Sequence, residues 1–286
     1  MSNSTRYSVL GAGHGGKAMA AHLSLMGFEV NLYNRTPEHI SAIKARGGIE
    51  LESQEGGPHG FGKLNLVTSD IQEAVEAADV LMVVVPSSAH ASIARNVGPF
   101  LRDGQIIILH PGRTCGALEV AKIIRDAGNK ADITISEAET FIYASRSDGP
   151  AQARIFRIKD AVPLASLPAI KTEQVLEVIN QAYPQYINGI NVLHTGLNNM
   201  GAIFHPTLTL LNAGWIESTH GDFQFYIDGV TPSVARFLEV LDRERVTVAS
   251  ALGIRAQSAM DWLQMAYTTS GSDLHEAIHN QPGYYG

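Results

Sequence analysis

Apolar runs alternate with amphipathic segments through about residue 185 of the 286-residue chain. Continuous apolar runs predict strands covered on both faces, as in a parallel sheet, and three lie at residues 80–86, 105–112 and 131–139. Apolar residues at helical spacing predict helices between them, at residues 71–78, 90–101 and 117–128. This order predicts an α/β fold with a Rossmann-like, doubly wound parallel sheet, which binds ligands beyond the carboxyl ends of its strands.

The last third of the chain has a different pattern. No strand-like run of comparable quality recurs after Ile155–Ile158, and from Asn188 onward the pattern is helical only. We therefore predict a sheet domain at residues 1–187 and an all-α second domain at residues 188–286. Residues 191–214 predict one long helix, whose apolar face is formed by Leu193, Leu197, Met200, Phe204, Leu208 and Leu211.

A glycine-rich turn follows the first short apolar strand. Gly11, Gly13 and Gly16 fit the dinucleotide fingerprint: the first permits a tight turn, the second lets the backbone approach a pyrophosphate, and the third lets helix and strand pack closely. Free N–H groups at the start of the following helix favour an anion. The sequence therefore predicts a dinucleotide site, which also includes His14 and Gly15.

The end of the second strand bears on which dinucleotide binds. An NAD site places an Asp or Glu about 20 residues beyond the glycines, where it accepts hydrogen bonds from the ribose 2′-OH. Here the chain reads Asn34, Arg35, Thr36, without an acid. A guanidinium can grip a 2′-phosphate with its planar fork, and Thr36 can add a hydroxyl contact. We predict NADP, with NAD as the alternative if Arg35 is only a solvated loop charge. Loops after later strands add the cofactor candidates Val85, Pro86, Pro111 and Gly112.

A polar stripe runs along the long helix predicted above. His194, Asn198, Gly201 and His205 are spaced by four, three and four residues. Buried polar groups must be paired, so such a stripe typically borders a cleft or a ligand. Pro206 removes a backbone hydrogen bond and bends the helix beside His205. We therefore predict that His205 is a general acid–base.

Composition narrows the possible partners and compartment. The formal net charge of −7 without a dense basic patch argues against nucleic acid. A single cysteine, Cys115, excludes an internal disulfide and fits a reducing compartment. No signal peptide and no apolar run of about 20 residues is found. We expect a cytoplasmic protein that binds no membrane.

A zinc-like pattern occurs near the end of the chain. Residues 275–279 read HEAIH, which can place two imidazoles on one helical face. Only seven residues follow, and Gln281–Gly283 ends the helix, so a third ligand is not expected. Asp273 and Glu276 fit a capping pair at the helix start instead, and we predict no metal site.

Several segments together resemble the octopine/nopaline (opine) dehydrogenase family, over essentially the whole chain. They read GAGHGGKAMAAHLSLMGFEV, ADVLMVVVPSSAHASIA, ILHPGRTCGALE, NVLHTGLNNMGAIFHPTLTLLNAG and FQFYIDGVTPSV. The resemblance implies an enzyme that joins the amine of an amino acid to a 2-oxo acid such as pyruvate and reduces the imine with NAD(P)H. It places the family's catalytic histidine at His205 and implies a homodimer. Family members continue with helices that carry an acidic partner of this histidine, so the chain is expected to be a fragment or to lack that partner.

This reaction requires groups that hold substrate carboxylates. The candidates are Thr140, Tyr143 and Arg146, which follow the run at 131–139, with Arg113 as a further candidate and Asn198 as a contact to substrate or to the nicotinamide amide. Two other functions stay open at this point. One is a reductase of a 2-oxo acid alone, similar to ketopantoate reductase, which relies on a lysine in its helical domain, although residues 188–286 contain none. The other is a non-catalytic NADP-binding protein.

Overall fold

The computed structural model describes residues 5–54, 57–267 and 269–285. It divides into two compact units, one up to Thr195 and one from Gly196 onward. The domain boundary at residue 187 stays a prediction.

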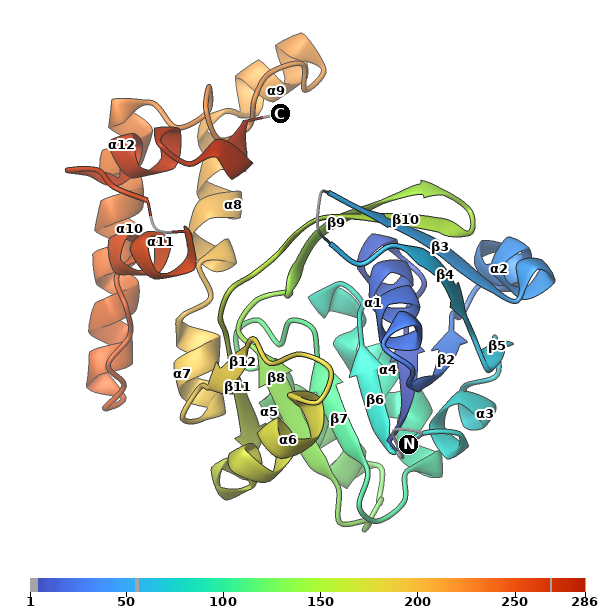
Figure 1. Ribbon diagram of the computed structural model, residues 1–286. Helices are drawn as coiled ribbons and strands as arrows, with labels where there is room; N and C mark the ends of the chain where they lie inside the picture. The colour runs from blue at the N-terminus through green and yellow to red at the C-terminus, as the bar shows by residue number, and fades with distance from the viewer. Residues whose placement is uncertain (1–4, 55–56, 268, 286) are drawn as a thin grey trace. The chain divides into compact units, whose positions relative to one another are not determined.

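The first unit is built on an eight-stranded sheet with the order β12-β11-β8-β7-β6-β1-β2-β5 (Figure 1). Its strands are β1 (Arg6–Leu10), β2 (Glu29–Tyr33), β5 (Leu66–Thr68), β6 (Val80–Val83), β7 (Ile106–Leu109), β8 (Thr134–Ala138), β11 (Val162–Leu167) and β12 (Tyr186–Asn188). Neighbouring strands are parallel except that β11 runs antiparallel to β8. The Rossmann-like, doubly wound sheet is confirmed. The expectation of no further strand after Ile158 is wrong, because β11 and β12 extend the sheet.

Helices cover both faces of this sheet. One face packs against α3 (Ile71–Glu76), α4 (His90–Val97) and α5 (Gly116–Asp126). The other face packs against α1 (His14–Leu25) and α6 (Thr172–Ile179). The short helix α2 (Ser41–Arg46) follows β2. Single 3-10 turns occur at Pro37–Ile40, Ser87–Ala89, Gly98–Phe100, Ala169–Lys171 and Pro282–Tyr284. Because successive strands are parallel, their carboxyl ends and the loops that follow them gather at one edge.

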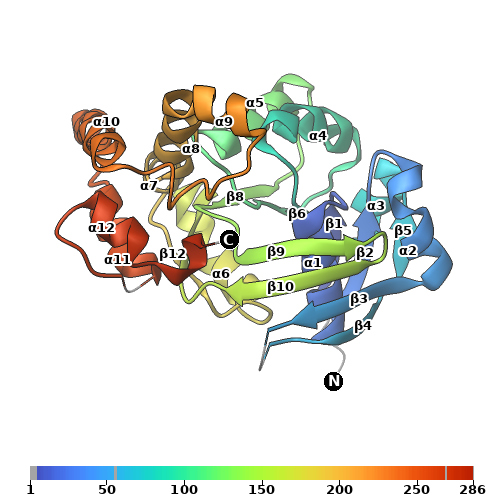
Figure 2. The same cartoon turned by 90° about the horizontal axis from the view of Figure 1, so that it is seen from above.

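A second sheet, with the order β4-β3-β10-β9, was not predicted. It consists of β3 (Gly48–Ser53), β4 (Gly60–Lys63), β9 (Tyr143–Gly149) and β10 (Gln152–Ile158). It packs on α1, which therefore lies between the two sheets (Figure 2). The pairing of β3 with β10 joins segments about 100 residues apart, which a local pattern does not reveal.

The second unit is helical throughout its described regular structure, as predicted. Its helices are α8 (Gly201–Leu211), α9 (Ala213–Thr219), α10 (Pro232–Ala251), α11 (Ala259–Tyr267) and α12 (Leu274–His279). The division between the units falls within α7 (Val192–Leu197). Thr231 caps α10 by accepting the backbone N–H of Val234, with Pro232 at the first helical position. In the described part of the chain, no helix is long and apolar enough to cross a bilayer.

The single helix predicted at 191–214 is wrong, because the chain breaks between α7 and α8. At the break, Arg245 Nη1 donates to the carbonyl oxygen of Leu197 at 2.5 Å, and Asn198 Oδ1 accepts the backbone N–H of Gln257 at 3.0 Å. These partners replace the helical hydrogen bonds that a continuous helix would make. The polar stripe therefore does not lie on one helical face. Of the predicted apolar face, Met200, Phe204 and Leu208 are in the core, whereas Leu193 and Leu211 are exposed.

Candidate active site

The glycine turn between β1 and α1 is tightly packed at two of its three glycines. Gly11 has a φ of +117°, a conformation that favours glycine, and its N–H donates to the carbonyl of Tyr33 at 2.9 Å. A Cβ on Gly11 would overlap the carbonyl oxygen of Val84, and one on Gly16 would overlap that of Gly11. A Cβ on Gly13 would meet nothing within 4 Å. The chain thus leaves open space at the one glycine whose backbone is expected to approach the pyrophosphate.

This contrast gives a matched pair of variants. We expect Gly16→Ala to lower the melting temperature, since the added methyl group overlaps backbone. We expect Gly13→Ala to keep the melting temperature and to weaken NADPH binding by about tenfold or more, since the methyl group would occupy the space of the pyrophosphate. Thermal unfolding and fluorescence titration with NADPH measure both effects. A Gly13→Ala protein that binds NADPH like the wild type would contradict this role of the turn.

A cavity of about 230 Å³ adjoins the glycine turn. The structure gathers many of the predicted cofactor residues at its wall, namely Gly11, Asn34, Arg35, Thr36, Val85 and Pro86. Asn34 shapes this wall, because its Oδ1 accepts the N–H of Ala12 at 3.2 Å and its Nδ2 donates to the carbonyl of Thr36 at 3.0 Å. The described lining residues include no carboxylate, but they include His39, which the sequence analysis did not single out. A cavity at this place suits the adenosine half of a dinucleotide, and Arg35 adds a cation to its wall.

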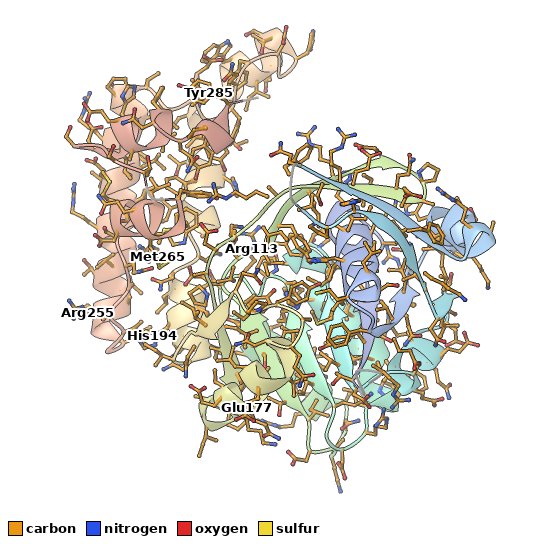
Figure 3. The ribbon with its side chains drawn as sticks, viewed as in Figure 1. Arg113, Glu177, His194, Arg255, Met265 and Tyr285 are labelled. Carbon is orange, nitrogen blue, oxygen red and sulfur yellow. The ribbon has the colours of Figure 1, made fainter. Side chains whose placement is uncertain are left out.

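Other cofactor candidates lie outside the cavity lining. His14 and Gly15 open α1, and His14 Nδ1 accepts the backbone N–H of Ser147 in β9 at 2.9 Å. Pro111 and Gly112 follow β7 at the carboxyl edge of the sheet. Arg113, labelled in Figure 3, continues the same loop toward α5.

Glu137, at the end of β8, is a buried carboxylate that packs directly on this loop. A Cβ on Gly112 would overlap the carboxyl group. Its Oε2 accepts the N–H of Ala117 at the start of α5 at 2.9 Å, and its Oε1 accepts the hydroxyl of Thr195 at 2.6 Å. Burial raises the pKa of Glu137 to about 7, against the opposing effect of these two hydrogen bonds. The sequence signal was a single acid in an apolar strand, which did not suggest these partners.

The raised pKa of Glu137 predicts how stability depends on pH. Between pH 4.5 and about 7 the folded protein binds more protons at this group than the unfolded chain, so the free energy of unfolding falls as pH rises through that range. The expected loss is about 3 kcal/mol. Glu137→Gln should abolish this fall in the free energy of unfolding, whereas Glu119→Gln on the exposed side of α5 should leave it unchanged. Urea unfolding at pH 5 and pH 8 measures the difference, and an unchanged pH dependence in Glu137→Gln would refute the prediction.

The structure places the candidate substrate residues of the first unit in three different surroundings. Thr140 Oγ1 accepts a hydrogen bond from Lys159 Nζ at 3.2 Å. Burial is the largest cause lowering the pKa of Lys159 to about 8, with nearby arginines lowering it further. Tyr143 is buried, and its hydroxyl is within hydrogen-bond distance of Tyr183 Oη, at 2.9 Å, and of a histidine of α1. Arg146 is exposed on β9. Arg146 is thus accessible to a ligand and Thr140 is half-buried, whereas the phenol of Tyr143 is engaged in the core.

In the second unit, His205 is exposed on α8, one residue before Pro206. Its Nε2 lies 2.8 Å from the hydroxyl of Tyr226, a partner that the sequence analysis did not identify. Asn198 is buried at the helix break, so it does not continue the helical face of His205. An imidazole with an oriented ring nitrogen can transfer a proton near neutral pH.

The two histidines of the zinc-like pattern make other contacts. His279 Nδ1 lies 2.7 Å from the carbonyl oxygen of His275, and its Nε2 lies 2.8 Å from that of Ile227. Asp273 Oδ1 accepts the N–H of Glu276 at 2.9 Å, so the predicted cap at the start of α12 is confirmed. Among the residues that the structure describes, no group of three His, Cys, Asp or Glu side chains is arranged to hold a metal.

A Rossmann-like sheet with this glycine turn and cavity, followed by an all-helical unit, defines the class of NAD(P)-dependent dehydrogenases. Comparisons with known families agree with this class. Residues 6–114 match the N-terminal domain of NAD-dependent glycerol-3-phosphate dehydrogenase. Residues 188–286 match the alpha-helical domain of NAD/NADP octopine/nopaline dehydrogenase.

Similarity to one curated relative extends over the whole chain. The chain is 42% identical to the opine dehydrogenase of Arthrobacter sp. (strain 1C), over all of its own length and 79% of the relative. It belongs to the opine dehydrogenase family and is an NAD(P)-dependent oxidoreductase, as the sequence resemblance predicted.

Solved structures share the fold. Octopine dehydrogenase, solved with NADH and L-arginine and also with NADH and pyruvate, has a TM-score of 0.78 and 18% identity, covering 99% of this chain and 75% of its own. Yersinopine dehydrogenase with bound NADP+ has a TM-score of 0.75 and 18% identity, covering 93% of this chain and 68% of its own.

Proposed function

We propose that this opine dehydrogenase joins the amine of an amino acid to a 2-oxo acid such as pyruvate and reduces the resulting imine with NADPH. The observation that carries the proposal is the 42% identity to the Arthrobacter opine dehydrogenase over the entire chain. The ligands named for octopine dehydrogenase, L-arginine and pyruvate, are an amino acid and a 2-oxo acid.

In this proposal His205 acts as the general acid. Formation of the imine requires that the hydroxyl group of the carbinolamine leaves as water, and His205 donates the proton that makes it a leaving group. The nicotinamide, when bound, supplies the hydride. The hydrogen bond between Tyr226 and His205 Nε2 holds the orientation of the imidazole ring.

We propose NADP rather than NAD as the preferred cofactor. The support comes from the cavity beside the glycine turn, where Arg35 and Thr36 stand in place of the carboxylate expected of an NAD site. The guanidinium supplies charge-assisted hydrogen bonds to a 2′-phosphate. The remaining cofactor contacts proposed are Gly11, Gly13, His14, Gly15, Gly16, Asn34, Val85, Pro86, Pro111 and Gly112.

The proposed substrate contacts are Thr140, Arg146 and Asn198. Arg146 supplies a cation that can hold a carboxylate in a bidentate pair, and Thr140 supplies a hydroxyl beside Lys159. Tyr143 is not retained as a substrate contact, because its hydroxyl is bonded within the core.

We further propose that the enzyme is a cytoplasmic homodimer that pairs through its helical domain. We also propose that the sheet domain ends at residue 187 and that the helical domain starts at residue 188. Exposed apolar side chains along α10 and at its C-cap support a dimer surface there, namely Phe237, Val240, Val248 and Leu252. The match to the octopine/nopaline helical domain starts at residue 188, which supports the boundary.

A steady-state assay tests the proposed reaction. Purified protein is mixed with NADPH and either an amino acid, pyruvate, or both, and the absorbance of NADPH is followed over panels of amino acids and 2-oxo acids. We expect oxidation only when both substrates are present. Oxidation with the 2-oxo acid alone would identify a simple 2-oxo acid reductase, and binding of NADPH without any oxidation would identify a non-catalytic protein. Either result would overturn the proposal.

A further inference from the structure

The segment that carries Tyr226 is a compact turn closed by its own hydrogen bonds. The N–H of Asp228 donates to the carbonyl of Gln224 at 2.8 Å, and the N–H of Gln224 donates to Asp228 Oδ2 at 2.8 Å. Val230 N–H donates to the carbonyl of Tyr226 at 3.0 Å. The turn therefore holds its shape, and its attachment to the rest of the helical unit decides where the phenol of Tyr226 lies.

Two side chains from other elements hold carbonyl groups of this turn. Asn212, which is buried at the end of α8, donates from Nδ2 to the carbonyl of Gly229 at 3.1 Å. His279, at the end of α12, places Nε2 2.8 Å from the carbonyl of Ile227, the residue directly after Tyr226. The His279 contact is thus one residue away from the group that touches His205.

The contacts of His279 restrict what its ring can do. Both ring nitrogens face carbonyl oxygens, which only accept hydrogen bonds. A neutral imidazole can donate to one of them, and a protonated imidazole can donate to both. The neighbouring ring of His275 lies against that of His279, tilted by 31°, with 4.1 Å between centroids. The hydroxyl of Tyr285, labelled in Figure 3, donates to the backbone carbonyl of His279 at 3.0 Å. His279 is therefore placed as a hydrogen-bond donor.

We propose that His279 is a positioning residue, which holds the carbonyl of Ile227 and thereby keeps the hydroxyl of Tyr226 on Nε2 of His205. This inference rests on the proposed role of His205 in proton transfer. It assigns a use to His279, the second histidine of a pair whose spacing resembles a zinc motif. The ring of Tyr226 also packs against Tyr284, with 4.4 Å between centroids, so the turn keeps an apolar support when the His279 hydrogen bond is removed.

A double-mutant cycle on kcat tests the inference. Tyr226→Phe removes the hydroxyl, and His279→Met removes the donor while keeping an apolar side chain of similar length. Each is expected to lower kcat about 3- to 10-fold, as for loss of one hydrogen bond. The double variant should be no slower than Tyr226→Phe alone, because His279 acts through that hydroxyl. His279→Gln keeps an N–H donor and should restore most of kcat. His275→Gln is the control on the same helix, because the hydrogen bond described for the carbonyl of Ile227 comes from His279 and not from His275, and it should stay within about twofold of wild type.

The possible failures are distinguishable. Two results would overturn the inference and leave the proposed function intact. One is a double variant whose loss of kcat equals the product of the two single losses, and the other is a His279→Gln protein as slow as His279→Met. Full activity of a His205→Ala protein would instead overturn the role of His205 on which the inference rests, and a wild-type protein that oxidises no NADPH with both substrates present would overturn the proposed function. If His279→Met does not fold, Tyr226→Phe decides alone, since an unchanged kcat would mean that no positioning passes through the hydroxyl. Titration with NADPH accompanies each variant, and its Kd should stay constant.

Discussion

Replacement of His205 with alanine is expected to lower kcat of the condensation by about 10²- to 10⁴-fold, which is the usual contribution of a general acid–base. The Kd for NADPH should stay within about twofold of wild type, because the predicted cofactor residues lie in the first unit and His205 lies in the second. The melting temperature should change little, since the side chain is exposed on α8. Steady-state kinetics and fluorescence titration measure the two effects.

Thr209→Ala supplies the control for His205→Ala. Thr209 is exposed and lies one turn further along α8, so its loss tests whether any change on this helix surface slows the enzyme. We expect kcat of Thr209→Ala to equal that of the wild type. If His205→Ala turns over at a comparable rate, another group must supply the proton.

Replacement of Arg35 with alanine is expected to raise the Kd for NADPH by about 10- to 150-fold, which corresponds to the loss of charge-assisted hydrogen bonds worth about 1.5–3 kcal/mol. NADH lacks the 2′-phosphate, so its Kd should change by no more than about twofold. The ratio of the two dissociation constants is the decisive quantity, because a general disturbance of the cavity would weaken both cofactors.

Arg46→Ala is the matched control for Arg35→Ala. Arg46 is a nearby cation on α2, but it pairs with Glu50 and does not line the cavity. Its removal changes the net charge by the same amount and should leave the NADPH-to-NADH ratio unchanged. A ratio that Arg35→Ala leaves unchanged would refute the assignment of the 2′-phosphate site.

Local sequence patterns were sufficient to predict the segments whose strands and helices pack against neighbours within a few tens of residues along the chain. The strand, glycine turn and helix from β1 through β2 could be predicted, because each element is specified by its own residues and the turn requires glycine at Gly11. The second sheet could not, since the pairing of β3 with β10 depends on residues far apart in sequence. The break before α8 was missed for the same reason, because Arg245 and Gln257 supply the hydrogen bonds that replace helical ones.

The candidate site shows the same limit. Arg35 was identified from its position after β2, and His205 from its spacing and from Pro206. Glu137 and Tyr226 were not assigned roles, because their significance lies in partners such as Thr195 and His205 that are remote along the chain. Tyr143 was placed among the ligand contacts because strand ends face the ligand edge. The first residue of β9 instead turns its ring into the space between the two sheets.

The contact between Gly112 and Glu137 has an evolutionary consequence. Because a side chain at position 112 and a glutamate at position 137 would occupy the same volume, position 112 cannot change freely. Shortening residue 137 does not make room for alanine at position 112, because the added methyl group would overlap the Cβ of residue 137. We therefore expect homologues to keep glycine at position 112 whichever side chain stands at position 137.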